Sequence, residues 1–152
     1  MTAAGNSQPF QGVAATYQPA FFQFSFQSTI YAVATHVDFS VAAGNGTLGT
    51  PTIPAKPGET IILWGTGFGP TTPAAPVGVE VPPTGFVTAS NVTATIGGQP
   101  AAVSGAALSQ GFAALYQIVV TVPAGLANGD YPIVATINGA ASPGNVMLTA
   151  HQ

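Results

Sequence analysis

A chain of 152 residues can form one domain with a buried core, but only 3% of these residues are charged, with one Lys or Arg against four Asp or Glu. So few basic side chains cannot neutralise phosphates, which excludes nucleic acids and anionic membrane surfaces as partners. Cysteine is absent, which excludes disulfides and thiolate metal sites, and no run of about 18 apolar residues predicts membrane insertion. The weak surface charge leaves little repulsion between copies and favours self-association.

The N-terminal part of the chain combines turn-forming residues with aromatic ones. Residues 1–20 are rich in Gly, Ser, Gln and Pro and predict an extended approach segment. Phe21–Gln27 then alternates between aromatic and polar residues, which predicts a strand with one face on the core. The core-facing residues of this strand are expected to be Phe22, Phe24 and Phe26.

A second alternating run, Tyr31–Val41, predicts another strand whose valine and aromatic side chains share one face. Ser28–Thr29 lies between the two runs. A hairpin turn is favoured there, and a bend within one strand is the alternative. Gly44–Thr47 predicts the tip of a further hairpin, because Gly and Asn favour tight turns.

The central segment carries the only tryptophan of the chain. After a Pro57–Gly58 turn, Thr60–Trp64 is a continuous apolar strand, which is typical of burial on both faces. A glycine-rich turn follows, and then Pro70–Gly85, a long proline-rich loop with polyproline character. The residues for which we expect structural roles are Trp64 in the core and Gly65, Gly67 and Phe68 in the turn.

The pattern is more regular from Val87 onward. Short strands separated by Gly, Pro and Asn turns are typical of an all-β sandwich, and no segment holds a helical period beyond about two turns. Gly105–Ala114, rich in small residues, is predicted to be a loop. The strands predicted in this part are Val92–Ile96, Ala101–Val103, Leu115–Val122, Tyr131–Asn138 and Asn145–Ala150.

Four stretches resemble immunoglobulin-like domains of the IPT/TIG type. Pro57–Gly69 is similar to the opening strand and Gly-x-x-Phe turn of that family, and Val92–Ala101 is similar to its second hairpin. Val122–Gly125 and Gly129–Val134 are similar to its penultimate pair of strands. More closely, residues 18–150 resemble an uncharacterised carboxy-terminal domain of large secreted proteins of soil bacteria. The elements shared with that domain are Ala55–Glu59, Gly65–Thr71, Ile96–Ala101, Leu115–Gln117 and Val122–Leu126.

This resemblance implies an all-β, immunoglobulin-like sandwich of about seven to nine strands over residues 51–152. Residues 1–50 would form an extension, with one or two strands that pack on the sandwich or on a neighbour. It also implies a secreted or cell-surface location, with the signal sequence outside this chain. Domains of this type serve adhesion, spacing, dimerisation or carbohydrate contact, and the resemblance carries no catalytic residue and no cofactor.

Two polar pairs are candidates for special roles. His36 and Asp38 fall on one strand face and are either half of a metal site or acid–base pair, or part of an exposed polar face, which we favour. Asp130 and Tyr131 follow a turn in a way that resembles the tyrosine corner of Greek-key sandwiches, so we expect structural roles for both. No catalytic constellation and no metal site are predicted.

Three early aromatic residues, Phe10, Tyr17 and Phe21, remain outside the predicted core face. They are candidates to dock on the sandwich, to stack on sugars or to insert into a neighbouring subunit. We therefore expect a non-catalytic extracellular structural or adhesion module that contacts other proteins, itself included. One alternative is a self-assembling subunit, filament or oligomer, whose N-terminal strand completes the sheet of a neighbour. The other is a carbohydrate-binding module that uses exposed aromatic residues such as Tyr17, Trp64 or Tyr116.

Overall fold

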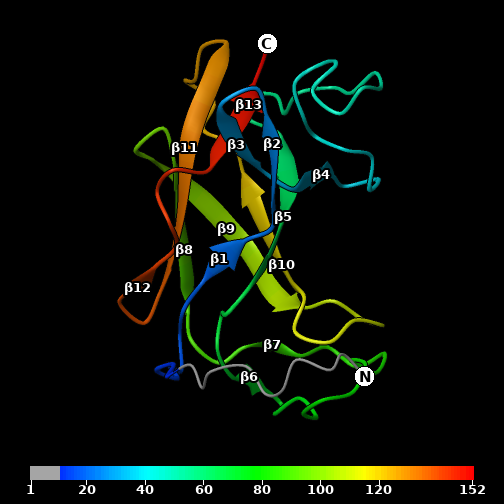
Figure 1. Cartoon of the computed structure of the whole chain (residues 1–152), viewed down its shortest axis with the longest axis vertical. Coiled ribbons are helices and arrows are strands. Elements are labelled where there is room, and N and C mark those ends of the chain that lie inside the picture. The colour runs from blue at the N-terminus through cyan, green and yellow to red at the C-terminus, as the bar shows by residue number, and fades with distance from the viewer. Residues whose placement is uncertain (1–10) are drawn as a thin grey trace, which may run out of the picture.

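The structure is a computed structural model that describes residues 11–152, and this part of the chain is all-β, without a helix (Figure 1). Its strands form a continuous sheet that curls into a nearly closed, barrel-like sandwich. The all-β prediction is confirmed, and the described residues form 13 strands, of which nine lie within residues 51–152 and four precede them. The strands are β1 (Ala20–Phe21), β2 (Gln23–Phe26), β3 (Thr29–Ala32), β4 (Ala34–His36), β5 (Thr60–Thr66), β6 (Thr71–Thr72), β7 (Val87–Thr88), β8 (Val92–Ile96), β9 (Gln99–Leu108), β10 (Tyr116–Thr121), β11 (Gly129–Ile137), β12 (Ala140–Ala141) and β13 (Met147–Ala150).

The sheet has the strand order β1-β5-β10-β9-β8-β11-β13-β3-β2, and two long strands bend it. β9 pairs with β8 up to Ala101 and with β10 from Ala102 onward. β11 pairs with β13 up to Pro132 and with β8 from Ile133 onward. Because each long strand changes partner along its length, the sheet turns a corner at β9 and at β11 and encloses a core.

The core follows the alternation read from the sequence. Ile118 and Val120 on β10, and Ile133 and Ile137 on β11, are at most 1% exposed, as their spacing predicts. Each such side chain contributes roughly 1.5–3 kcal/mol when it is buried. The largest fully buried side chains are those of Phe68, Ile61, Leu63, Ile96, Ile118, Ile133, Ile137 and Leu148.

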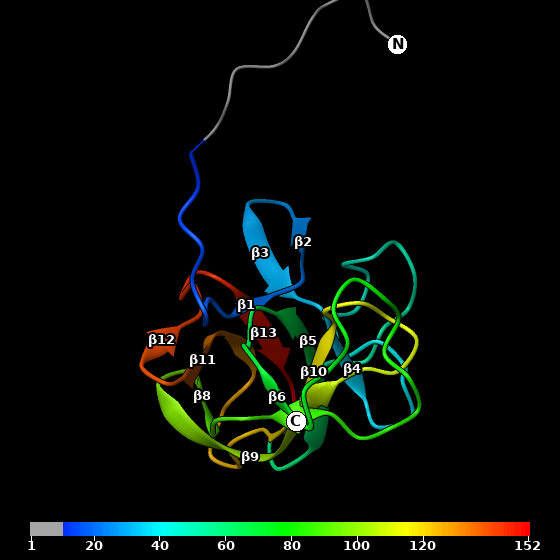
Figure 2. The same ribbon diagram turned by 90° about the horizontal axis from the view of Figure 1, so that it is seen from below.

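The predicted N-terminal hairpin is present, but its core face was assigned to the wrong residues. β2 and β3 pair antiparallel around a turn at Gln27–Ser28. Phe21 is only 6% exposed, whereas Phe22 is 45% exposed. The reason is that Phe21 ends β1, which lies on β5, and the hairpin then leaves the body of the sandwich (Figure 2). The protruding β2–β3 hairpin covers its own aromatic side chains only in part, so Phe24 and Phe26 are half-buried.

The strand predicted for Tyr31–Val41 is shorter and presents the opposite face to the core. It is divided into β3 and β4 and ends at His36. Val37 and Phe39 are 63% and 64% exposed, because the chain turns away after β4, with Phe39 at a φ of 66°. The face that is buried carries small side chains, those of Ala32 and Ala34.

Three backbone hydrogen bonds form a junction where the hairpin leaves the sheet. β1 and β4 lie end to end along one edge of β5, and the β2–β3 hairpin departs between them. Phe22 N–H donates to the Trp64 carbonyl at 2.9 Å, Trp64 N–H to the Val33 carbonyl at 3.1 Å, and Val33 N–H to the Phe22 carbonyl at 2.7 Å. Since β3 also pairs with β13, the N-terminal strands join the two ends of the sheet. We call the point formed by Phe22, Val33 and Trp64 the junction.

Three further sequence expectations are corrected. β9 continues to Leu108, into the predicted loop Gly105–Ala114, because β10 pairs with it as far as Tyr116. β5 extends through the first glycine of the predicted turn, to Thr66. Gly44–Thr47 is a turn inside an irregular segment, not a hairpin tip. Residues on both sides of position 50 share one core cluster, so the N-terminal strands pack on their own sandwich.

The glycine-rich segment after β5 is shaped to receive the N-terminal segment of its own chain. A Cβ atom added to Gly65, Gly67 or Gly69 would lie 2.0–2.6 Å from atoms of residues 17–20. Gln18 N–H donates to the Gly67 carbonyl at 2.9 Å, which continues the pairing of β1 with β5. The glycines therefore serve a close approach between two backbones, in addition to the positive φ values of Gly67 and Gly69. We call these three residues the glycine track.

Gly65→Ala is expected to lower the free energy of unfolding by about 2–3 kcal/mol, because the new Cβ would lie 2.6 Å from the carbonyl oxygen of Ala20. Gly65 has no positive φ, so this effect is steric. Gly105→Ala is the matched control in β9, since its nearest contact would lie at 3.9 Å, and it should change stability by less than about 1 kcal/mol. Chemical denaturation measures both. Equal effects would contradict the packing of residues 17–20 on β5.

Candidate functional site

An open apolar groove lies at the junction. The side chains of Phe22, Val33 and Trp64 form one wall, and the loop between β9 and β10 forms the other. The groove measures about 620 Å³, and Phe22 and Phe112 beside it are 45% and 58% exposed. Apolar atoms make up most of its lining. We call it the junction groove, and the residues that line it are Phe22, Val33, Trp64, Phe112, Ala113 and Leu115.

Trp64 belongs to this groove and is only partly buried, so the prediction that it is a core residue is corrected. Its indole Nε1–H donates to Thr35 Oγ1 at 3.1 Å, and its ring lies 6.3 Å from that of Phe39. The core position is taken by Phe68, which is fully buried and packs at 6.3 Å from Phe21. The hydrogen bond fixes the polar edge of the indole and leaves apolar ring surface on the groove.

The two early aromatic residues that the structure describes, Tyr17 and Phe21, both pack on the sandwich. Phe10 lies outside the described residues. Tyr17 packs against Gly69, and its hydroxyl lies 3.1 Å from Ser90 Oγ. Phe21 is buried in the core. Of the three roles left open by the sequence, Tyr17 and Phe21 take the first and dock on their own sandwich.

Sequence reasoning missed the two exposed phenylalanines of the groove. Phe22 follows the same alternation as Phe24, and only the change of strand partner at the junction moves it outside. Phe112 is the one aromatic residue in Gly105–Ala114, a stretch that the sequence predicts to be a loop of small residues. That isolation was the available signal.

Asp130 and Tyr131 make the contacts of a structural pair. The Tyr131 hydroxyl donates to the carbonyl of Ala127 at 3.1 Å, which is the contact expected of a tyrosine corner. The Asp130 carboxylate accepts from the Tyr31 hydroxyl at 2.8 Å and from Thr149 Oγ1 at 2.7 Å. Burial, with the hydrogen bond and charge of Asp130, raises the pKa of Tyr31, so the phenol stays a donor. Asp130 thereby connects the protruding β2–β3 hairpin to β11 and β13.

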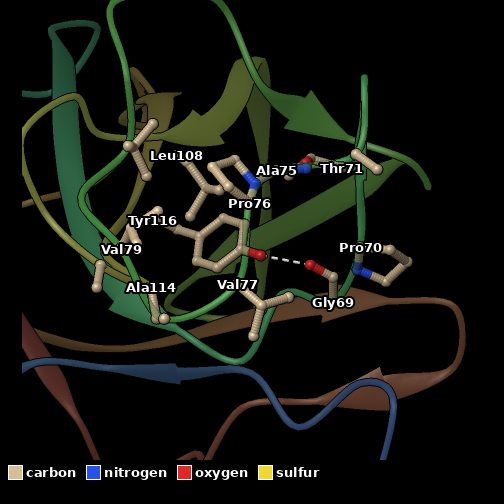
Figure 3. Close-up of a pocket in the computed structure, with 14 residues that line it drawn as sticks. Gly69, Pro70, Thr71, Ala75, Pro76, Val77, Val79, Leu108, Ala114 and Tyr116 are labelled. Carbon is tan, nitrogen blue, oxygen red and sulfur yellow. Dashed lines mark hydrogen bonds between the residues drawn. The ribbon is translucent and has the colours of Figure 1, made fainter.

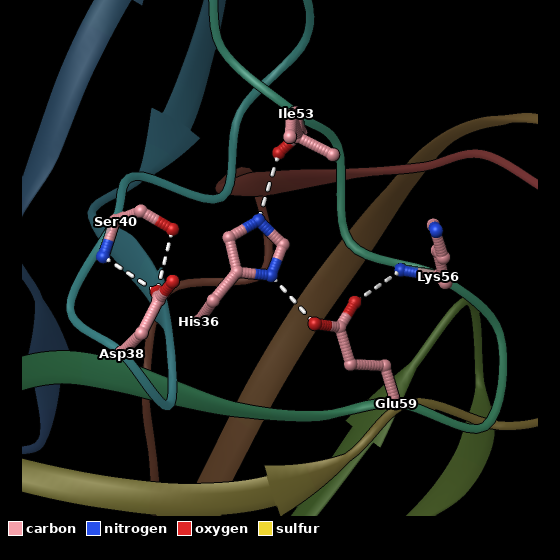
Figure 4. Close-up of polar contacts among 6 residues, drawn as sticks. All are labelled: His36, Asp38, Ser40, Ile53, Lys56 and Glu59. Carbon is pink, nitrogen blue, oxygen red and sulfur yellow. Dashed lines mark hydrogen bonds and ion pairs between the residues drawn. The ribbon is translucent and has the colours of Figure 1, made fainter.

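A second polar cluster forms beside β4 (Figure 4), where four of the few ionisable side chains line a pocket of about 320 Å³. His36 Nδ1 lies 2.6 Å from Glu59 Oε1, and His36 Nε2 lies 3.1 Å from the carbonyl of Ile53. The backbone N–H of Lys56 donates to Glu59 Oε2 at 2.8 Å. These contacts hold the irregular segment between β4 and β5 against both strands. The four ionisable side chains are those of His36, Asp38, Lys56 and Glu59.

His36 and Asp38 do not share a strand face, although their alternation in the sequence predicts that they would. The chain turns immediately after β4, so Asp38 leaves the strand face that His36 occupies. Its carboxylate instead accepts from the hydroxyl and the backbone N–H of Ser40, at 2.6 and 2.9 Å, and these bonds lower the pKa of Asp38. The partner of His36 is Glu59, which lies 23 residues away in the sequence.

The surroundings of His36 favour the imidazolium form. Nε2 faces a carbonyl oxygen and Nδ1 faces a carboxylate, and both partners accept hydrogen bonds only, so both ring nitrogens need a proton. Burial lowers the pKa of His36, but the hydrogen bonds to Glu59 and Ile53 and the charges of Glu59 and Asp38 outweigh it. The pKa is therefore raised above its ordinary 6.5. The charged His36 side chain therefore links Glu59 to the backbone at Ile53.

The proline-rich loop folds over the end of β10 and forms a third pocket, of about 470 Å³ (Figure 3). Tyr116 lies in this pocket and donates its hydroxyl to the carbonyl of Gly69. Burial raises the pKa of Tyr116, and its ring packs 5.6 Å from Phe68. Tyr116 is thus occupied by contacts within the sandwich, while Val77 on the loop is 97% exposed.

Residues 11–152 contain neither a cluster of metal-binding side chains nor a membrane-spanning helix. No group of three or more His, Asp or Glu side chains in this range could hold a metal ion. The same residues form no helix that is long and apolar enough to cross a membrane. The described residues therefore offer an apolar contact surface at the junction groove and a charged cluster whose hydrogen bonds are made internally.

Stability is expected to fall as the pH rises from about 6.5 through the raised pKa of folded His36. A raised folded pKa means that the folded state binds the proton more tightly than the unfolded state, so the contribution is complete at lower pH and is lost on deprotonation. We expect a loss of about 1 kcal/mol, the value of a charge-assisted hydrogen bond reduced for partial exposure. Denaturation between about pH 5.5 and 8.5 measures it.

His36→Gln should flatten this pH dependence, because the substituted side chain does not titrate. His151→Gln is the control, since His151 is exposed at the end of the chain, and it should retain the dependence of the unmodified protein. A slope that persists in His36→Gln and disappears in His151→Gln would contradict the assignment.

No protein family, no curated protein and no solved structure matches the chain.

Proposed function

We propose that this chain is a non-catalytic structural or adhesion module of a secreted or cell-surface protein, and that it contacts its partner through the junction groove. The observation that carries the proposal is the placement of the exposed Phe22 and Phe112 beside Trp64 in one open groove. Contiguous exposed aromatic surface is uncommon on monomeric proteins and is enriched where proteins bind one another. The groove is therefore the surface from which binding energy is expected.

The proposed relation to IPT/TIG-type immunoglobulin-like domains supports the same function. It rests on the sequence resemblance and fits a sandwich in which Tyr131 bonds back to Ala127. Domains of that type serve adhesion and spacing. The surface, with one basic residue in 152, also suits a setting in which binding must not depend on charge.

The carbohydrate-binding alternative now depends on one residue. Tyr17 and Tyr116 are engaged with Ser90 and Gly69, so Trp64 is the remaining aromatic candidate for stacking on a sugar. A sugar also needs hydrogen-bonding groups around it, and the groove lining is mostly apolar. The apolar surface of another protein fits this lining better than a polysaccharide does.

Phe112→Ser is expected to weaken retention of the protein on immobilised bacterial cell envelopes by about tenfold or more, since burial of one Phe contributes roughly 1.5–3 kcal/mol. The fold should be unaffected, because Phe112 is 58% exposed. Val13→Ser is the matched control, at a position that is 95% exposed and outside the groove. Retention that is equal in both variants, or that disappears at high salt, would count against the groove.

Trp64 provides a direct optical test, because it is the only tryptophan and lines the groove. Solubilised envelope proteins should shift its emission to shorter wavelength as water leaves the indole, and Phe112→Ser should reduce that shift. Soluble cellulose and chitin fragments are the comparison. A shift with these fragments alone would favour the carbohydrate-binding alternative.

A further inference from the structure

The outer edge of β2 is open. Within residues 11–152, β2 is the last strand of the sheet and pairs with β3 alone. Figure 2 shows the β2–β3 hairpin standing out from the rest of the sandwich, so the edge is approachable. A strand edge of this kind presents unpaired N–H and C=O groups to which another strand can add.

The hydrogen-bond pattern of the hairpin identifies the open groups. Phe26 faces Thr29 across a two-residue turn, and Val33 N–H donates to the Phe22 carbonyl. Antiparallel pairs alternate between bonded and non-bonded, so Phe24 and Phe26 use their backbone groups toward β3, as the carbonyl of Phe22 does. The backbone N–H and C=O of Gln23 and Ser25 then point away from β3. Among the described residues these groups have no hydrogen-bond partner.

In the part of the chain that the structure describes, no charged residue, proline or bulge protects this edge. Natural edge strands carry charged residues, proline or a bulge that block addition of another strand. β2 has the sequence Gln-Phe-Ser-Phe, its pairing with β3 is regular, and no charged residue occurs between Gln11 and Thr35. The copies of a chain with this composition meet no repulsion at the edge.

We propose that β2 pairs with β2 of a second copy of this chain, antiparallel and edge to edge. The open groups set the register: Gln23 of each copy lies opposite Ser25 of the other and exchanges both backbone hydrogen bonds with it. Phe24 then lies on the twofold axis, opposite its equivalent in a non-bonded pair. The same Phe24 ring already stacks on Tyr31 at 5.6 Å, so the hairpin presents it in a fixed position.

This register makes a disulfide test decisive, because the chain has no cysteine of its own. Opposed residues of a non-bonded pair have Cα atoms about 4.5 Å apart, within the range of a disulfide. Under mild oxidation Phe24→Cys should form a covalent dimer at least about tenfold faster than Val77→Cys. Val77 is the matched control because it is 97% exposed and away from the edge. Equal rates would overturn the proposal.

A second pair of variants separates backbone pairing from side-chain contact. In the Phe24→Cys background, Ser25→Pro removes the N–H that the partner needs, at a position where the hairpin itself uses none. Ser25→Ala keeps that N–H and is the control. Cross-linking should fall by about tenfold or more with the proline and stay unchanged with the alanine. An equal rate in both would overturn the register.

The dimer is independent of the junction groove and of the proposed function. Sedimentation of the unmodified chain should show a fraction of dimer that rises with protein concentration. Phe112→Ser should leave that fraction unchanged. Ser25→Pro should in turn leave retention on cell envelopes unchanged. A monomer that persists up to about millimolar concentration would overturn the proposal without touching the adhesion experiment, since that monomer can still bind envelopes.

Discussion

The sandwich depends on one close approach between backbones. Residues 17–20 lie against the glycine track, which begins in β5 and continues past its end. They lie so close that a Cβ atom added to any of the three glycines would collide with them. This contact carries β1 onto the edge of β5 and brings the junction into place. Because β4 occupies the rest of the same edge, the strands before residue 50 complete the sheet that the later strands begin. The glycines thus allow two distant parts of the sequence to form one fold.

Both surfaces with a proposed role result from the same interruption. The strand that covers β5 is divided at Phe22 and Val33, and the chain between them forms the outstanding hairpin. At the division, side chains that would be interior in a continuous strand turn outward and form the junction groove. In the hairpin, backbone groups that a longer sheet would cover remain open. An insertion within an edge strand therefore creates a groove and an edge together.

The sequence predicted well the strands whose surroundings are constant along their length. β10 keeps one face on the core from end to end, so the alternation of Tyr116, Ile118 and Val120 was sufficient. The N-terminal strands change partner at the junction while their alternation continues. Phe22 therefore could not be placed by its period.

The polar contacts were predictable only where they are local. Tyr131 and Ala127 lie four residues apart, and a turn pattern indicated their contact. The partner of His36 lies across an irregular segment, and no local pattern relates them. Asp130 was recognised from its neighbour Tyr131, but its bond to Tyr31 spans 99 residues and depends on the closure of the whole sheet.

The positions of the two ends of the described chain indicate how the glycine track responds to a pulling force. Residues 11–17 and the end of β13 lie toward opposite ends of the long axis (Figure 1). The hydrogen bonds between β1 and β5 and at Gln18 lie along one strand edge, so a pull on residues 11–17 that slides β1 along β5 loads them together. The atoms of residues 17–20 that pack closely against the glycine track oppose the same sliding motion. The contact that closes the sheet therefore also opposes a pull along the long axis of the sandwich.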